Sequence, residues 1–159
     1  MSGKSSSVER VRAALLAGGH PDTIREFPAG TRTAADAAEA VGCEVAQIAK
    51  SIVFRAGGQA ALVIASGANR VDARKVGEVL GVKLKRADAD FVRETTGFAI
   101  GGVSPVGHIA PPLLVIDRDL LDLHPIYAAA GSPSHVFRTE AEDLVRLTGA
   151  KVADIRQEE

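Results

Sequence analysis

Two features of the sequence have the residue types that a ligand-binding site needs. The first is Lys50, the only charged residue in the stretch VAQIAKSIVF. A lysine in apolar surroundings is desolvated and attracts an anion. The same lysine could instead end a helix, where its stem packs on apolar neighbours and its ammonium group reaches water. The second feature is the stretch GFAIGGVSPVGHIAPP, from Gly97 to Pro112.

The Gly97–Pro112 stretch holds four glycines and three prolines with few polar side chains between them. It is not a P-loop, because it lacks the Gly-Lys-Ser/Thr ending and no helix opens after it. It also lacks the spacing of a dinucleotide fingerprint. A nucleophile elbow needs a glycine where Val106 stands, and Pro105 removes a backbone donor. Two interpretations remain: a wide turn between strands, or a wall whose backbone N–H and C=O groups face a ligand.

The other chemically capable side chains do not form a known motif. The four histidines, at positions 20, 108, 124 and 135, lack the spacing of metal ligands. Cys43 is the only cysteine, which excludes an internal disulfide and a multi-cysteine metal site and agrees with a reducing cytoplasm. A serine esterase using Ser104 and His108 is the weakest alternative, because the elbow around Ser104 is incomplete.

Composition narrows the class of protein further. The chain has 159 residues, 46% of them hydrophobic and 25% charged, with a net charge of −1, which is typical of one globular domain. It has no tryptophan and 4% aromatic residues, so a base-stacking platform is not expected. The basic residues Lys83, Lys85 and Arg86 fit either a solvated edge strand or a contact to a phosphate backbone. No apolar run is long enough to span a membrane.

Hydrophobic periodicity and capping residues indicate an α+β fold. The start of the chain has no apolar signal core, so we expect a flexible tail over residues 1–7 and a single domain over residues 8–159. We predict helices over residues 8–17, 34–41, 43–50, 73–80, 89–96 and 140–148. We predict strands over residues 23–27, 51–56, 59–66, 82–87, 112–121, 124–131 and 134–138. Successive strands without crossover helices pair mainly antiparallel, so we expect a mixed, strongly curved and partly barrel-like sheet surrounded by helices.

Several helix ends carry explicit signals. The expected N-caps are Thr33 with Asp36, Asp72 and Asp88, and the expected stops are Gly81 and Gly97. For the last helix, Thr139 and Glu142 have the spacing of a capping box.

Lys50 and the glycine-rich stretch, in this order, resemble the YbaK/EbsC family, which includes the editing domain inserted in bacterial prolyl-tRNA synthetases. The similarity runs from about residue 31 to residue 155. It rests on three segments: TAADAAEAVGCEVAQIAKSIVF, GFAIGGVSPVGH and AEDLVRLTGAKVADI. The family's essential lysine matches Lys50, and its G-x-x-x-P loop matches Gly101 to Pro105.

The resemblance implies trans-editing: hydrolysis of the ester of mischarged aminoacyl-tRNA, releasing amino acid and tRNA. It implies that Lys50 orients the terminal phosphate or sugar. The backbone of Gly101, Gly102, Val103 and Ser104, in a loop fixed by Pro105, would hold the aminoacyl group and stabilise developing charge. His135, on a strand expected to face the pocket, is a weaker substrate-binding candidate. Such a site needs no metal and no cofactor, and its nucleophile is either water or a group of the substrate.

A second hypothesis belongs to a different functional class. The chain could be a non-catalytic module of the same fold that binds an amino-acid-like ligand or a protein partner. The net charge of −1 supports it, because electrostatic affinity for tRNA would be weak. Under the editing hypothesis, the expected partner is the acceptor end of mischarged tRNA, and a synthetase or an elongation factor could supply the missing affinity.

Overall fold

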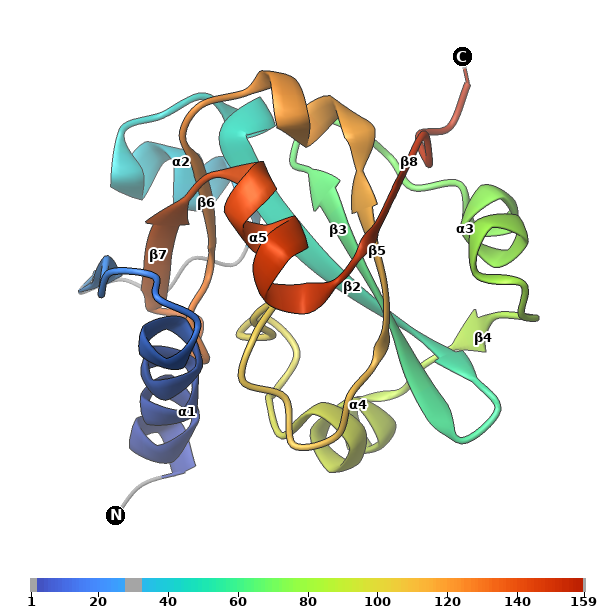
Figure 1. The fold of residues 1–159 in the computed structure, drawn as a ribbon, viewed down its shortest axis with the longest axis horizontal. Coiled ribbons are helices and arrows are strands. Elements are labelled where there is room, and N and C mark those ends of the chain that lie inside the picture. The colour runs from blue at the N-terminus through green and yellow to red at the C-terminus, as the bar shows by residue number, and fades with distance from the viewer. Residues whose placement is uncertain (1–2, 28–32, 159) are drawn as a thin grey trace.

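The computed structural model describes residues 3–27 and 33–158, and it shows a curled sheet with helices around it (Figure 1). The α-helices are α1 (Gly3–Ala17), α2 (Ala34–Val41), α3 (Ala73–Leu80), α4 (Ala89–Thr96) and α5 (Ala141–Thr148). Two 3₁₀ segments are η1 (Val45–Gln47) and η2 (Arg118–Asp122). The strands are β1 (Ile24–Glu26), β2 (Ile48–Ala56), β3 (Gln59–Ser66), β4 (Lys85–Arg86), β5 (Leu113–Asp117), β6 (Ile126–Ala129), β7 (His135–Thr139) and β8 (Lys151–Ala153).

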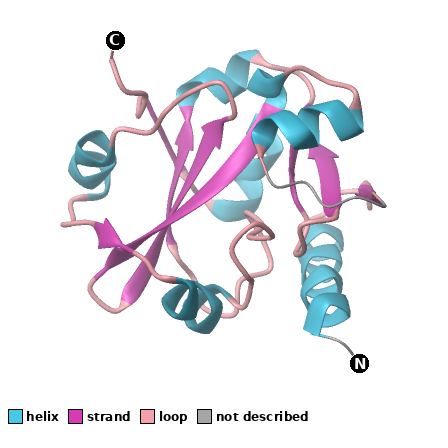
Figure 2. Cartoon of the chain, turned by 180° about the vertical axis from the view of Figure 1, so that it is seen from behind, coloured by secondary structure: helices cyan, strands magenta, loops and turns pink. Residues whose placement is uncertain are grey.

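The described strands form one mixed sheet in the order β1-β7-β6-β2-β3-β5-β8, with β4 paired to β2 beside this path. The hairpin β2–β3 and the pairs β6–β7 and β1–β7 are antiparallel, whereas β2–β6, β3–β5 and β5–β8 are parallel. The sheet curls strongly without closing (Figure 2). The predicted α+β class and the mixed, curved sheet surrounded by helices are therefore confirmed.

Strand β3 is the centre of the molecule because both of its faces are buried. Leu62 and Ile64 point into the main core with residues of α1, α5 and β7. Val63 and Ala65, one position along, pack under α3 with Val76. A strand covered on both faces is a near-continuous apolar run, which is why AALVIAS was readable as a strand.

The helix predicted over residues 43–50 is wrong. Only η1 is helical there, and Ile48 already begins strand β2, so Lys50 lies within a strand and does not end a helix. Val45 and Ile48 have helical spacing, but the ladder with β3 extends back to Ala49, and the Gly67 N–H donates to the Ile48 carbonyl at 2.7 Å. Pairing with a buried strand overrides a local helical pattern of this length.

Other differences lie at element ends and edges. Helix α1 begins at Gly3, within the stretch expected to be a tail, because extending a helix that is already packed costs little. The capping box predicted for α5 is absent: Glu140 is the N-cap, and the buried Thr139 hydroxyl pairs with His20 Nε2 at 2.9 Å. Strand β8 was not predicted. Strand β4 is shorter than predicted, with two residues instead of the range 82–87. Strand β5 ends at Asp117 instead of residue 121, because η2 follows it.

The expected caps of three other helices are confirmed. The Thr33 hydroxyl accepts from Asp36 N–H, and the Thr33 N–H donates to the Asp36 carboxylate, as in a capping box. Asp72 and Asp88 cap α3 and α4, which end at Gly81 and Gly97. None of the described helices is both long and apolar enough to cross a membrane.

Candidate functional site

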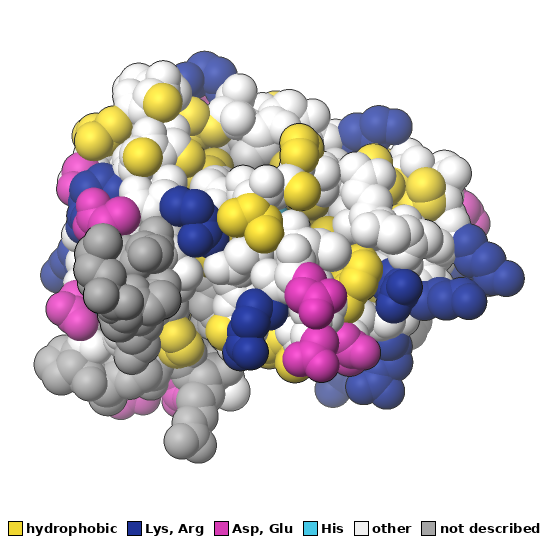
Figure 3. Space-filling model, turned by 90° about the horizontal axis from the view of Figure 1, so that it is seen from below, with side chains coloured by type: hydrophobic (Ala, Val, Ile, Leu, Met, Phe, Trp, Pro, Cys, Tyr) yellow, Lys and Arg dark blue, Asp and Glu magenta, His cyan; other side chains and the backbone are white. Residues whose placement is uncertain are grey.

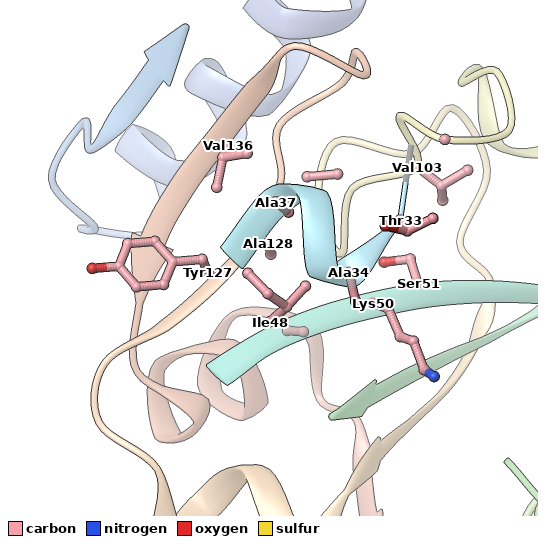
Figure 4. Close-up of a pocket in the computed structure, with 13 residues that line it drawn as sticks. Thr33, Ala34, Ala37, Ile48, Lys50, Ser51, Val103, Tyr127, Ala128 and Val136 are labelled. Atoms are coloured by element: carbon pink, nitrogen blue, oxygen red, sulfur yellow. The ribbon is translucent and has the colours of Figure 1, made fainter. Parts of the chain in front are cut away.

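A cleft lies where α2, β2, the Gly97–Pro112 loop and the β6–β7 pair meet (Figure 4). It encloses about 630 Å³ of space, part of it open to solvent. Its lining residues are Thr33, Ala34, Ala37, Ile48, Ala49, Lys50, Ser51, Gly101, Val103, Tyr127, Ala128, Ala129 and Val136. Small apolar side chains therefore form most of the wall, and Lys50 is the only charged residue in the described part of it.

The cleft exists because one edge of β2 is incompletely paired. On that edge β6 pairs only with Ile48 and Ala49, and β4 pairs only with Phe54 and Arg55. The register with β3 turns the backbone polar groups of Ser51 and Val53 toward this open edge, since alternate residues of an antiparallel strand face opposite sides. The Ser51 Oγ is buried and has no partner among the described residues. A polar ligand could satisfy these groups.

Lys50 lines the cleft near the start of β2, and its side chain points away from Val103 (Figure 4). Its Nζ donates to the backbone carbonyl of Asn69 at 2.5 Å. The Asn69 side-chain amide in turn donates to Asp117 Oδ2 at 2.9 Å and to Asp119 Oδ2 at 2.8 Å. Asp117 is buried and also accepts from the Ser66 N–H. The loop that holds the Lys50 ammonium group is thus fixed by a buried carboxylate.

The environment of Lys50 weakens its hold on a proton. Burial of the ammonium group lowers the pKa of Lys50, and the nearby charge of Arg70 lowers it further, while Asp117 acts in the opposite direction. A cation that is partly desolvated lacks part of its hydration and gains more from an anionic ligand than an exposed lysine does. In Figure 4 the Lys50 side chain points away from Val103, so the ammonium group and the glycine-rich loop occupy different parts of the cleft.

The glycine-rich loop presents two of its predicted residues to the cleft and buries the rest. Gly101 and Val103 line the cleft, and Gly101 has φ +97°, which favours glycine. Gly102, Ser104 and Pro105 are buried behind this wall. The Gly102 N–H donates to the Ala99 carbonyl at 3.0 Å, so it is not free for a ligand. No hydrogen bond within the described chain uses the N–H of Gly101 or Val103.

Ser104 and His108 do not form a nucleophile–base pair. The Ser104 hydroxyl accepts from the Val106 N–H at 3.2 Å, and Ser104 is fully buried. The His108 ring places Nε2 at 2.6 Å from the Ser104 carbonyl, not from the hydroxyl. Burial lowers the pKa of His108, which keeps the ring neutral and able to donate this hydrogen bond. The pair holds the shape of the loop, and the geometry excludes the serine esterase alternative.

Arg10 of α1 donates hydrogen bonds to two separate positions of the glycine-rich loop. Its Nη2 donates to the Gly97 carbonyl at 2.7 Å, and its Nε donates to the Gly107 carbonyl at 3.1 Å. Its guanidinium also lies 4.9 Å from the centre of the Phe98 ring. The helix can approach this closely because Gly107 has no side chain: a Cβ there would lie 3.1 Å from the Arg10 backbone.

Arg10→Ala should therefore destabilise the protein and disorder the loop. Losing two charge-assisted hydrogen bonds and a cation–π contact is expected to cost about 2–4 kcal/mol of unfolding free energy. Arg12→Ala, on the same helix, is the matched control, because Arg12 pairs with Glu9 and Asp22 at the surface, which is worth about 0–1 kcal/mol. Urea titration measures both. Equal losses in the two variants would show that Arg10 is not a clamp.

His135 lies on β7 but outside the cleft lining. Its neighbour Val136 lines the cleft, and successive side chains of a strand point to opposite faces. The His135 Nδ1 lies 2.6 Å from the Ser132 Oγ, and its Nε2 lies 3.8 Å from a Glu26 carboxylate oxygen. Ser132 in turn packs against Gly102, where an added Cβ would lie 2.8 Å from the Ser132 Cα. His135 thus supports the turn behind the glycine-rich loop.

The remaining candidate side chains do not form a metal site or an activated thiol in the described part of the chain. The described residues contain no group of three His, Cys, Asp or Glu side chains that could hold a metal ion. Burial raises the pKa of the Cys43 thiol, and Glu44 raises it further, so this thiol is not activated.

Sequence reasoning missed part of the cleft. It did not single out Ser51, the alanines of the wall or Tyr127. Ser51 follows Lys50 directly, but its role depends on the gap between β6 and β4, which no local pattern shows. The alanines of α2 and β6 are ordinary in helices and strands, and only their convergence makes them a wall.

The fold and the cleft define a class of protein: a curled α+β domain with one lysine and a glycine-rich backbone wall facing a small apolar cavity. The family profile of the aminoacyl-tRNA editing domain matches residues 28–147. The chain belongs to this family. Helix α1, with Arg10, lies outside the matched residues.

Individual relatives agree with this assignment. The uncharacterised protein YwhH of Bacillus subtilis is 30% identical over 92% of this chain and 94% of its own. The proline–tRNA ligase of Lactobacillus helveticus is 32% identical over 57% of this chain, which is 16% of the ligase. A crystal structure described as a candidate trans-editing enzyme for prolyl-tRNA synthetase is 46% identical, covers 96% of this chain and 98% of its own, and superposes with a TM-score of 0.89.

Proposed function

We propose that this protein hydrolyses the ester bond of mischarged aminoacyl-tRNA in trans. The observation that carries the proposal is the cleft itself, which is lined by one partly desolvated lysine, a backbone wall and small apolar side chains. A synthetase distinguishes amino acids that differ by one methylene by only about 1–3 kcal/mol, so a second, size-limited site is needed to remove errors. Membership of the editing-domain family and the likeness to the candidate trans-editing structure support it.

We propose a role in this reaction for each of the following residues. The Lys50 ammonium group binds the terminal phosphate or ribose and orients the ester. The N–H groups of Gly101 and Val103 stabilise the negative charge that develops on the carbonyl oxygen. The oxygen of water, or a nucleophilic group of the substrate, attacks the carbonyl carbon. The bond to the ribose oxygen then breaks, and that oxygen takes up a proton. Because the ester is already activated, positioning and charge stabilisation suffice.

The cleft also limits the substrate. Apolar walls of alanine and valine disfavour a charged side chain, because its desolvation would not be compensated. We propose that the aminoacyl group is small and uncharged.

A non-catalytic binding module is the second candidate function. It is favoured by one observation: the Lys50 ammonium group is held by the Asn69 carbonyl at 2.5 Å and points away from Val103. A module of this kind would bind an amino-acid-like ligand in the cleft and would not cleave the ester.

A deacylation assay separates the two candidates. The protein is incubated with tRNAs charged with Ala, Cys, Ser, Thr or Pro, and the loss of esterified amino acid is followed over time. We expect turnover of at least one small aminoacyl-tRNA. Ser104→Ala should cost about 1 kcal/mol of stability through its loop hydrogen bond and leave the reaction intact. No turnover with any of the five tRNAs would reject the enzyme, and activity that depended on the Ser104 hydroxyl would reject the mechanism.

A further inference from the structure

Four cations gather at the far end of β2, away from the cleft. Arg55, Lys83, Lys85 and Arg86 line a depression of about 900 Å³ beside the β2–β3 turn. All four side chains are exposed, and none of them forms an ion pair with a carboxylate of the described residues. Figure 3 shows Lys and Arg side chains concentrated at this end of the molecule, although the net charge of the chain is −1.

The arrangement of these cations is unfavourable without an anion. Arg55 and Lys85 are directly opposite each other on the antiparallel β2–β4 ladder, and like charges in this position repel. Charge on β4 alone would serve to keep a free edge from pairing, but this purpose does not require Arg55 to face Lys85. Arg55 is also held in place, by a hydrogen bond to the Gly57 carbonyl at 3.0 Å and by the Phe91 ring at 4.8 Å. A concave group of like charges in which Arg55 is held in place is suited to an anion.

The position of the depression indicates which anion it binds. Strand β2 carries Lys50 in the cleft and Arg55 in the depression, five residues apart, which corresponds to about 17 Å along a strand. Both residues lie on strand β2, at a separation that an RNA strand covers in a few nucleotides. Because an odd number of positions separates them, their side chains leave the strand on opposite faces, so only an extended ligand can contact both. A polymer with a phosphate at every step can occupy both sites at once, whereas a small anion cannot.

We propose that this depression binds the sugar-phosphate backbone of the tRNA acceptor stem while the aminoacylated 3′ end occupies the cleft. The proposal rests on the proposed function for its choice of RNA. It gives a local origin for tRNA affinity in a chain with almost no net charge, since electrostatic binding depends on the phosphates that individual cations neutralise. Recognition of this kind is independent of base sequence.

The test measures binding of uncharged tRNA, so it does not depend on catalysis. In the double variant Lys85→Gln/Arg86→Gln we expect on the order of tenfold weaker binding at low salt. The dependence of log K on log salt should become shallower by about 2, one for each phosphate contact removed. Lys83→Gln, which lies outside the strands, should shift both quantities in the same direction even if β4 is disturbed in the double variant. The control is Lys151→Gln, an exposed lysine on β8 that does not line the depression.

A second substrate distinguishes the depression from the cleft. Hydrolysis of an aminoacyl ester of adenosine, which has no acceptor stem, should be unchanged in the double variant, because this substrate reaches only the cleft. If the Lys85→Gln/Arg86→Gln and Lys83→Gln variants both bound tRNA with wild-type affinity and salt dependence, the proposal for the depression would be overturned. The proposed deacylase activity would not be affected. If the wild-type protein hydrolysed no ester but the depression variants lost tRNA binding, the depression would stand as a tRNA-binding site and the deacylase would be rejected. If the wild-type protein did not bind tRNA, the proposal would also fall.

Discussion

Lys50→Ala should lower kcat/KM for the aminoacyl-tRNA substrate by about 10²–10³, which corresponds to about 2.7–4 kcal/mol of transition-state stabilisation. Among the described residues that line the cleft, Lys50 is the only charged one, so none of these other lining side chains can replace its ammonium group. The fold should survive the change, because Lys50 is only half-buried and its single hydrogen bond goes to the Asn69 carbonyl. Steady-state kinetics on the best tRNA of the panel measures the loss, and Lys151→Ala is the control for removing an exposed lysine.

The pH dependence of the same reaction tests the state of Lys50. Because burial lowers its pKa, the ammonium group loses its proton at a lower pH than an exposed lysine does. The contribution of Lys50 is therefore present below this lowered pKa and declines as the pH rises through it. Lys50→Arg, which stays charged, should retain part of the rate and lose the decline. Full activity in Lys50→Ala would leave a deacylase possible but would remove Lys50 from its site.

The sequence does not contain the geometry that relates Lys50 to the glycine-rich loop. In the structure, Lys50, Gly101 and Val103 line one cleft. The local pattern around Lys50 indicated a helix end, and the structure has a strand instead, because pairing with β3 starts at Ala49. Local periodicity describes one segment at a time, whereas the open edge of β2 depends on where β6 and β4 stop.

The fold was predictable where short-range chemistry decides it. Thr33, Asp72 and Asp88 cap their helices as expected, because the cap and its N–H partners lie within three residues of each other. The cap expected at Thr139 failed because a residue far away in the chain, His20, takes its hydroxyl. The same limit applies to the glycine-rich loop: its bareness was visible, but Arg10, which holds it, comes from a helix nearly ninety positions earlier.

Gly102→Ala should reduce both the activity and the stability of the protein. A Cβ at this position would lie 2.8 Å from the Ser132 Cα and 3.0 Å from two further backbone atoms of Ser132. Backbone atoms cannot turn aside as a flexible side chain can, so the loop itself must move. Overpacking of this kind costs about 1–3 kcal/mol of unfolding free energy. A displacement of about 1 Å at Gly101 and Val103 would move their N–H groups out of hydrogen-bond range of the substrate carbonyl oxygen. This should lower kcat/KM by about 10².

Gly58→Ala is the matched control for Gly102→Ala. Gly58 lies in the β2–β3 turn, and a Cβ there would meet no atom within 4 Å. It therefore tests the glycine-to-alanine change without the clash, and we expect both stability and kcat/KM to stay close to those of the wild type. Urea unfolding and single-turnover deacylation should be measured on both variants. If Gly102→Ala lost stability but kept the wild-type rate, the glycine-rich loop would be a structural turn, and the charge-stabilising groups would have to be sought at the open edge of β2, beside Ser51.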